Sequence, residues 1–208
     1  MDWQRLDPKS AKSVIQQVAS TTDPGLISAG SSQVDRAHLP FYRGCALFKV
    51  TNYASLPSFT FFFLGDGQFF HYLDGSQDAL SAMHNKGFLR LDQQNTLEYL
   101  AFHYRYVRRA EGDIYIIHDS EHMPFIDVLD DASQLAIKRA FRPAEISQNP
   151  ETGDFDVLCC LYDGGIMNFG HFSITKDGVI TLIEETMIAN NFGPDTVSDT
   201  KQAANTAS

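Results

Sequence analysis

The sequence predicts an α+β fold, and three observations lead to that class. Four β-rich segments follow one another from about residue 140 to residue 190, a second hairpin signal lies near residues 58–73, and helical patterns precede and separate these regions. Strands and helices grouped in this way along a chain are typical of α+β domains. We therefore expect a long, curved antiparallel meander with helices packed on one face.

The meander is the strongest of these signals. Asp-Gly and Gly-Gly pairs separate its later strands, and these residues supply the positive φ angles that tight hairpin turns need. Aromatic and β-branched residues fill the segments between the turns. The expected strands are Phe141–Ser147, Asp154–Asp163, Ile166–Thr175 and Val179–Ala189.

The first half of the chain contains the second hairpin, in which a Gly-Asp-Gly turn joins Phe59–Leu64 to Gln68–Leu73. Apolar residues at spacings of three and four predict helices over Lys9–Ala19 and Asp92–Arg109. The intervening stretch Leu26–Leu39 is small and polar, so we expect a surface loop there.

A length of 208 residues, of which 43% are hydrophobic, suits a single α+β domain over residues 1–192. Residues 193–208 are small and polar. Such a composition cannot bury enough apolar surface to offset the entropy of ordering, so we expect a disordered C-terminal tail.

The charge balance excludes two classes of partner. A net charge of −10 gives no electrostatic basis for binding a nucleic acid or an anionic membrane surface.

No segment approaches the apolar length of a membrane span, and the first residues lack the pattern of a signal peptide. Cys45, Cys159 and Cys160 have no metal-like spacing. We therefore expect a soluble, acidic, reduced cytoplasmic protein.

Cofactor and nucleophile fingerprints are absent from the sequence. It contains no G-x-S-x-G, no G-x-G-x-x-G and no P-loop motif. We expect no cofactor. The sequence offers no support for a nucleophile-elbow hydrolase or for a dinucleotide-binding protein.

One short motif suggests a metal. The segment from His118 to His122 matches the H-x-x-E-H pattern of inverted zinc metallopeptidases, which place both histidines on one helix. A strand pattern precedes it and Met123-Pro124 follows it, which disfavours a helix. There are two alternatives. One is a metal site formed by a loop, in which Asp119 or Glu121 assists the two histidines, and the other is an ordinary polar turn.

Other histidines lie on predicted regular elements. His71 belongs to a strand of the second hairpin, His103 to the main helix and His171 to the meander. A carboxylate neighbour would suit any of them for general acid–base work. Asp156, Glu184 and Glu185 are the candidate neighbours. The more common alternative is that each histidine has a structural role, packing at the edge of an apolar face and forming a hydrogen bond.

Three arginines, Arg105, Arg108 and Arg109, are the local concentration of positive charge. They form a candidate anion-binding site. The alternative is that they complement the C-terminal dipole of the main helix and pair with Glu98 or Glu111.

This layout is similar to the cystatin-like and nuclear-transport-factor-2-like rolls, in which a helix lies in a cupped sheet. That resemblance implies a cavity, and such folds serve enzymes and binding modules alike. The stretch from Tyr72-Leu73-Asp74-Gly75 through Leu97-Glu98-Tyr99-Leu100 to Val107 also resembles uncharacterised bacterial proteins, which implies no activity.

The sequence leaves the biochemical function unknown. The long sheet and the aromatic residues favour a non-catalytic cytoplasmic domain that binds a small ligand or a protein partner in the sheet concavity. The alternative is a small acid/base enzyme, a lyase, isomerase or hydrolase, that uses His and Asp or Glu in the same cavity. A homodimer formed through exposed apolar residues is the third hypothesis.

Overall fold

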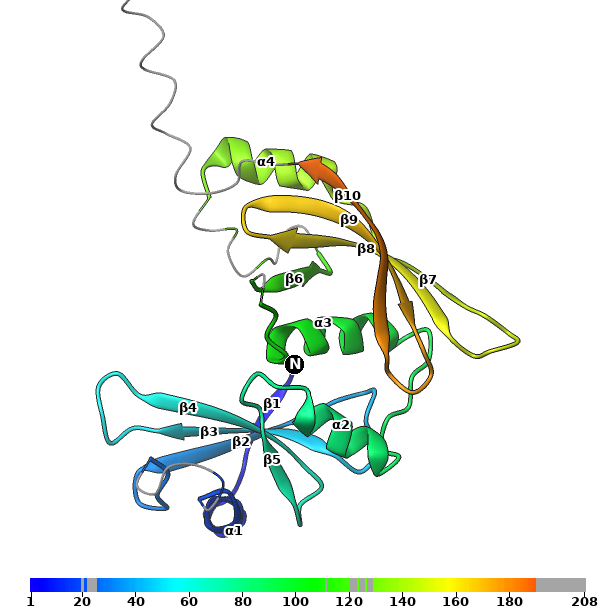
Figure 1. Cartoon of the computed structure of the whole chain (residues 1–208). Helices are drawn as coiled ribbons and strands as arrows, with labels where there is room; N and C mark the ends of the chain where they lie inside the picture. Colours follow the sequence, from blue (N-terminus) through cyan, green and yellow to red (C-terminus); the bar gives the residue numbers. More distant parts are fainter. Residues whose placement is uncertain are drawn as a thin grey trace, which may run out of the picture. The chain divides into compact units, whose positions relative to one another are not determined.

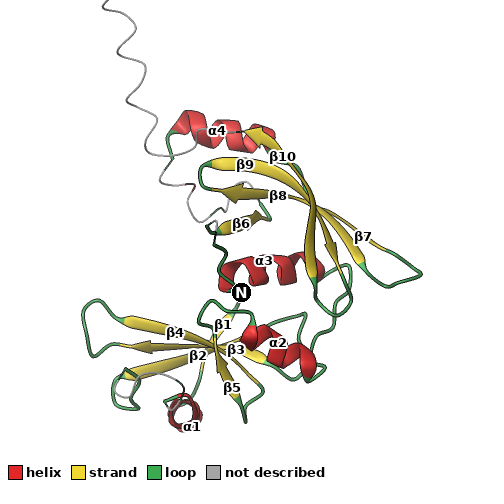
Figure 2. Cartoon of the chain, viewed as in Figure 1, coloured by secondary structure: helices red, strands yellow, loops and turns green. Residues whose placement is uncertain are grey.

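The computed structural model describes residues 1–19, 21, 26–110, 112–119, 123, 126 and 129–189. In this part of the chain it confirms the α+β class, with two open antiparallel sheets and four helices (Figures 1 and 2). The internal contacts define two compact units, Met1–Tyr99 and Leu100–Ser208. The expectation of one domain over residues 1–192 stays a prediction. The expected tail, residues 193–208, lies outside the described residues.

Unit 1 is built on a five-stranded antiparallel sheet in which sequence neighbours are also spatial neighbours (Figure 1). The unit also contains α1 (Pro8–Val18) and α2 (Asp78–Asn85). The strands are, in order, β1 (Trp3–Arg5), β2 (Ser32–His38), β3 (Ala46–Asn52), β4 (Phe59–Gly65) and β5 (Phe70–Tyr72).

Helix α1 confirms the helix expected over Lys9–Ala19. Asp7 caps its N-terminus by accepting hydrogen bonds from the backbone N–H groups of Lys9 and Ser10, and Pro8 occupies the first turn. The apolar stripe of the helix is buried with Val34 and Phe48 of the sheet. The sequence pattern therefore identified both the helix and its buried face.

The loop expected over Leu26–Leu39 is wrong, because β2 lies there. Its polar residues gave a loop pattern, yet Asp35 is buried between Arg5 of β1 and Lys49 of β3. Burial alone raises the pKa of this carboxyl, but hydrogen bonds and charge from Arg5 and Lys49 outweigh burial and hold the pKa below 3.8. The partners of Asp35 lie on neighbouring strands, so a local pattern does not reveal them.

Unit 2 is built on a second five-stranded antiparallel sheet with β8 at its centre. β8 pairs with β9 on one side, and β7 and then β6 cover its other side. Helix α3 (Thr96–Tyr106) spans the unit boundary, and α4 (Asp131–Ala140) belongs to unit 2. The strands are β6 (Ile114–Ile117), β7 (Glu145–Gln148), β8 (Phe155–Asp163), β9 (Ile166–Ile174) and β10 (Ile180–Ala189).

The three longest strands of the meander match their predictions, and the first does not begin where expected. The backbone N–H of Phe141 donates to Ile137 at 2.9 Å, so this residue ends α4 and the strand begins at Glu145. Helix α3 (Thr96–Tyr106) is also shorter than the helix predicted over Asp92–Arg109. Asp92 forms a turn before it, accepting from the N–H of Asn95 at 3.0 Å.

Side chains from β8 divide between the two faces of the sheet. One face carries Val157 opposite Phe172, whose ring meets Tyr104 of α3 at 5.9 Å. The other face has an apolar end, where Cys160 packs with Ile137 of α4, and a polar end with Asp156. α4 therefore covers half of this second face and leaves the polar half exposed.

Among the described residues, no helix has both the length and the apolar character required to cross a membrane.

The core of unit 2 gives a direct stability test on α4. Ile137 is fully buried, whereas Leu135 on the same helix is 48% exposed. We expect Ile137→Ala to lower the free energy of unfolding by about 2–4 kcal/mol. Leu135→Ala is expected to change it by less than about 0.5 kcal/mol. Urea unfolding followed by circular dichroism measures both values, and equal effects would contradict the packing of α4 described above.

Candidate functional site

A histidine and a carboxylate meet on the polar half of the unit 2 sheet. His171 Nε2 lies 3.1 Å from Asp156 Oδ1. On β8, Leu158 is directly opposite His171, and Asp156 lies two residues away on the same face. Glu184 of β10 is directly opposite His171 on its other side. The structure therefore brings together three residues that the sequence marked as candidates.

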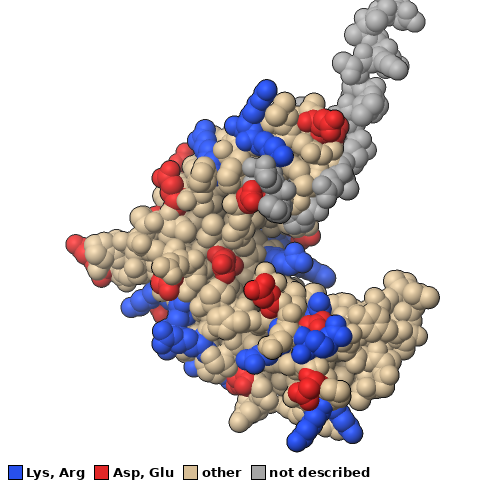
Figure 3. Space-filling model, turned by 180° about the vertical axis from the view of Figure 1, so that it is seen from behind, with Lys and Arg blue, Asp and Glu red and all other residues tan. Residues whose placement is uncertain are grey.

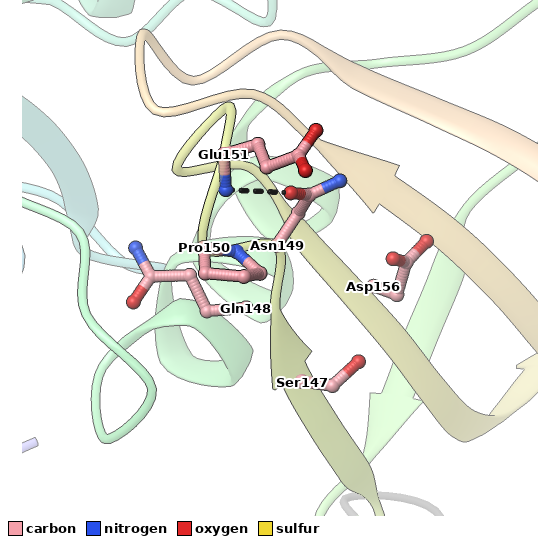
Figure 4. Close-up of a pocket in the computed structure, with 6 residues that line it drawn as sticks. All are labelled: Ser147, Gln148, Asn149, Pro150, Glu151 and Asp156. Carbon is pink, nitrogen blue, oxygen red and sulfur yellow. Dashed lines mark hydrogen bonds between the residues drawn. The ribbon is translucent and has the colours of Figure 1, made fainter.

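A polar depression of about 440 Å³ lies beside this group (Figure 4). It is lined by Asp156 and by the β7–β8 hairpin, where Asn149 Oδ1 accepts a hydrogen bond from the Glu151 N–H at 2.9 Å. The side chains of His171 and Asp156 are 34% and 51% exposed. Water therefore reaches both groups and screens their interaction, so this site does not enclose reacting atoms.

The other two candidate histidines lie elsewhere. His71 is on β5 of unit 1, opposite Leu64 of β4. His103 lies on α3, where its ring contacts that of Tyr104, and Tyr104 packs on Phe172. Phe172 and His171 are consecutive on β9 and project to opposite faces. His103 is therefore on the opposite side of the sheet from the pair that His171 forms.

The three arginines contact different partners. The guanidinium group of Arg105 lies 5.9 Å from the ring centre of Tyr106, and Arg109 lies 3.9 Å from the Asp163 carboxylate. Arg108 is exposed. Burial raises the pKa of the nearby Tyr104 hydroxyl, and the Arg109 charge opposes that increase. The described contacts therefore support structural roles for Arg105 and Arg109, and the anion-binding site stays a prediction.

The metal hypothesis falls partly outside the described residues. His118 is exposed at the end of β6, while Glu121 and His122 are not described. Among the residues that the structure does describe, no three His, Cys, Asp or Glu side chains are placed to hold a metal ion.

A second surface, on β4 of unit 1, was not singled out by the sequence. All seven residues of β4 pair with β3, but only Phe63, Leu64 and Gly65 pair with β5. The backbone N–H of Leu73 adds one hydrogen bond to the Phe62 carbonyl. Backbone groups of alternate residues point to the same side of a strand, so the N–H and C=O of Thr60 point to the outer side, beyond the end of β5.

Side chains along this open edge are aromatic and uncharged. Phe59 is 45% exposed, and the rings of Phe61 and Tyr72 lie 6.0 Å apart on the same face. On the opposite face, Phe62 lies 6.2 Å from Trp3. No charged residue occurs between Lys49 and Asp66. On the face shown in Figure 3, the end of unit 1 that carries the β3–β4 loop has neither Lys and Arg nor Asp and Glu atoms.

Another long edge in the structure is protected in ways that β4 is not. The outer strand of unit 2, β10, has register shifts between Leu182 and Glu184 and between Met187 and Ala189. It also carries the charges of Glu184 and Glu185. Bulges and charges of this kind discourage pairing with another strand. β4 carries no charge and no register shift between Phe59 and Phe62, so its outer side at Thr60 lacks this protection.

The sequence analysis also missed a partly buried histidine, His84, that packs against two buried tyrosines of unit 1. The Tyr42 hydroxyl lies 3.0 Å from His84 Nε2, and the rings of Tyr42 and Tyr99 each lie 5.9 Å from the His84 ring. Burial lowers the pKa of His84 below 6.5 and raises the pKa of the Tyr42 hydroxyl. Both groups are therefore neutral near pH 7. The sequence signal that could have indicated this packing is the presence of apolar residues around His84.

The partly buried imidazole of His84 predicts a dependence of stability on pH. The folded pKa of His84 is lowered, so the unfolded chain takes up the proton first, and stability is fully present above pH 6.5 and is lost as the pH falls below it. In His84→Gln this loss is expected to be smaller. Urea midpoints across this pH range measure it, with His38→Gln, on the exposed part of β2, as the matched control. Parallel pH profiles for wild type and His84→Gln would contradict the burial of His84.

Comparison with known proteins gives no relative for this chain. No family model, no curated protein and no solved structure matches it. The resemblance to cystatin-like and nuclear-transport-factor-2-like rolls and to uncharacterised bacterial proteins therefore stays a prediction, and function has to be argued from the geometry above.

Proposed function

We propose that this protein is a non-catalytic binding domain that takes up an extended polypeptide segment at the outer edge of β4. The observation that carries the proposal is the incomplete pairing of β4, which is paired along its whole length with β3 but on its other side only as far as Phe62, where the Leu73 N–H donates to the Phe62 carbonyl. An added strand would complete the backbone hydrogen bonds of Thr60 and cover the rings on both sides of it.

The aromatic side chains support this proposal. A strand paired with β4 would place its alternate side chains against Phe59 and Phe61 on one face and against Phe62 and Trp3 on the other. Such cross-strand aromatic pairs stabilise antiparallel sheets. The expected ligand is therefore an uncharged, extended segment rich in aromatic and β-branched residues.

The group around His171 supports the acid/base alternative less well. His171 and Asp156 are within hydrogen-bond distance, as that alternative requires. Both side chains are accessible to water, and the adjacent depression is lined by polar residues. An ordinary surface ion pair accounts for this geometry.

Selection from a library of random peptides displayed on phage tests the proposal. We expect the enriched peptides to alternate aromatic and β-branched residues. Thr60→Pro is expected to weaken their binding by about tenfold or more, because it removes the outward N–H, while the fold persists because an edge strand tolerates proline there.

Thr60→Ala is the matched control for this experiment. It removes the Thr60 hydroxyl, which lies 3.2 Å from that of Thr51, but keeps the backbone N–H. Binding is expected to survive this change. Peptides that bind wild type and Thr60→Pro equally well would overturn the proposal.

A further inference from the structure

We infer that a depression between β1 and β2 of unit 1 binds a free α-amino acid. The carboxylate of this ligand contacts Arg36 and His38 on β2, and its ammonium group contacts Asp2 and Gln4 on the β1 side. β2 and β3 lie between β1 and β4 in the sheet, so this site is separate from the β4 edge. The inference therefore goes beyond the proposed function and does not depend on it.

The depression has the size of a small-molecule site. Its volume is about 450 Å³, and small-molecule sites typically have volumes of about 300–1,000 Å³. A free amino acid fits within it. The lining residues are Asp2, Trp3, Gln4, Arg36 and His38.

The register of the sheet places these side chains together. Gln4 of β1 lies directly opposite Arg36 of β2, and His38, two residues further along β2, projects to the same face. Val34 also projects to this face and is buried with the residues of α1, whereas Arg36 and His38 are exposed. Helix α1 therefore covers one half of β2 and leaves the other half as the floor of the depression.

The two strands supply opposite kinds of polar group. On β2, the guanidinium of Arg36 has five N–H donors and no acceptor, and the imidazole of His38 donates at least one N–H. On the β1 side, the carboxylate of Asp2 and the amide oxygen of Gln4 accept hydrogen bonds. Neighbouring strands lie about 4.8 Å apart. A row of donors beside a row of acceptors at this spacing is complementary to a small ligand with one negative and one positive end.

These polar groups are available to a ligand. Within the described part of the chain, none of the side chains of Asp2, Gln4, Arg36 and His38 forms a hydrogen bond or an ion pair. The Arg36 guanidinium lies 5.9 Å from the ring centre of Phe48, which is directly opposite on β3. This contact uses the face of the guanidinium, so its N–H donors remain free to grip a carboxylate in the bidentate manner.

Charge selects an amino acid over ligands of a single sign. A phosphate or a dicarboxylate would bring negative charge close to Asp2, and a diamine would bring positive charge close to Arg36. An α-amino acid carries one charge of each sign, with only one carbon between its carboxylate and its ammonium group. It satisfies both rows of the depression without a repulsive contact.

Titration of the full chain with each of the standard free amino acids, followed by the NMR shifts of backbone amides, tests the inference. We expect at least one amino acid to cause saturable shifts at Gln4, Arg36 and His38. The same amino acid with an acetylated nitrogen or an amidated carboxyl is expected to bind about tenfold or more weakly, because each derivative lacks one of the two charges.

Substitutions assign the two ends of the ligand. Arg36→Met keeps an unbranched side chain beside Phe48 but removes the donors, and Asp2→Asn removes the negative charge. Each is expected to weaken binding of the amino acid by about tenfold or more. Arg43→Met, at an exposed arginine of unit 1 outside the depression, is the matched control and is expected to leave binding unchanged. Unchanged shifts elsewhere in unit 1 show that the variants remain folded.

Three results would overturn the amino acid as ligand. They are the absence of saturable shifts with every amino acid, equal binding of the acetylated or amidated derivative, and equal or tighter binding of inorganic phosphate. None of them bears on the peptide selection, because Thr60 lies on a different strand and contributes nothing to the depression.

Discussion

Backbone hydrogen bonding between antiparallel strands is the constraint on which this structure depends. A strand inside a sheet satisfies its N–H and C=O groups only when both of its sides are paired along their length. β8 meets this condition, because β9 covers one side and β7 and β6 together cover the other. β4 does not, because β5 and the Leu73 that follows it reach only as far as Phe62, and no strand among the described residues pairs with the outer side of β4 at Thr60. The same rule that organises both sheets therefore points to the surface at which we propose that another strand is added.

The distribution of charge agrees with that assignment. In unit 2, polar and charged groups occupy the exposed half of the sheet, where His171 and Asp156 pair in contact with water. In unit 1, the charges of Arg5 and Lys49 are used to hold the buried carboxylate of Asp35 between three strands. The sequence from Val50 to Gly65, which includes β4, contains no charged residue, although the chain is strongly acidic. An uncharged aromatic edge is a hazard for a monomer unless a partner covers it.

The sequence predicted much of the fold because its signals are local. Turn residues and alternating apolar residues lie next to one another in the chain, so β8, β9 and β10 were found from them. β2 was missed because Asp35 depends on partners on other strands. The pairing of His171 with Asp156 was among the predicted possibilities, since both lie on adjacent strands of the meander. The open edge of β4 was not predicted. It depends on the order of the strands in the sheet and on where β5 ends, and a local sequence pattern reveals neither.

Amide hydrogen exchange of the dilute chain, resolved by NMR, tests the central claim most directly. The N–H of Phe61 points to β3 and is expected to exchange slowly, whereas the N–H of Thr60 points outward and is expected to exchange much faster. Adding a peptide that binds the edge should slow exchange at Thr60. A Thr60 amide that is already as protected as that of Phe61 in the dilute chain would show that the edge is covered, and would contradict the account.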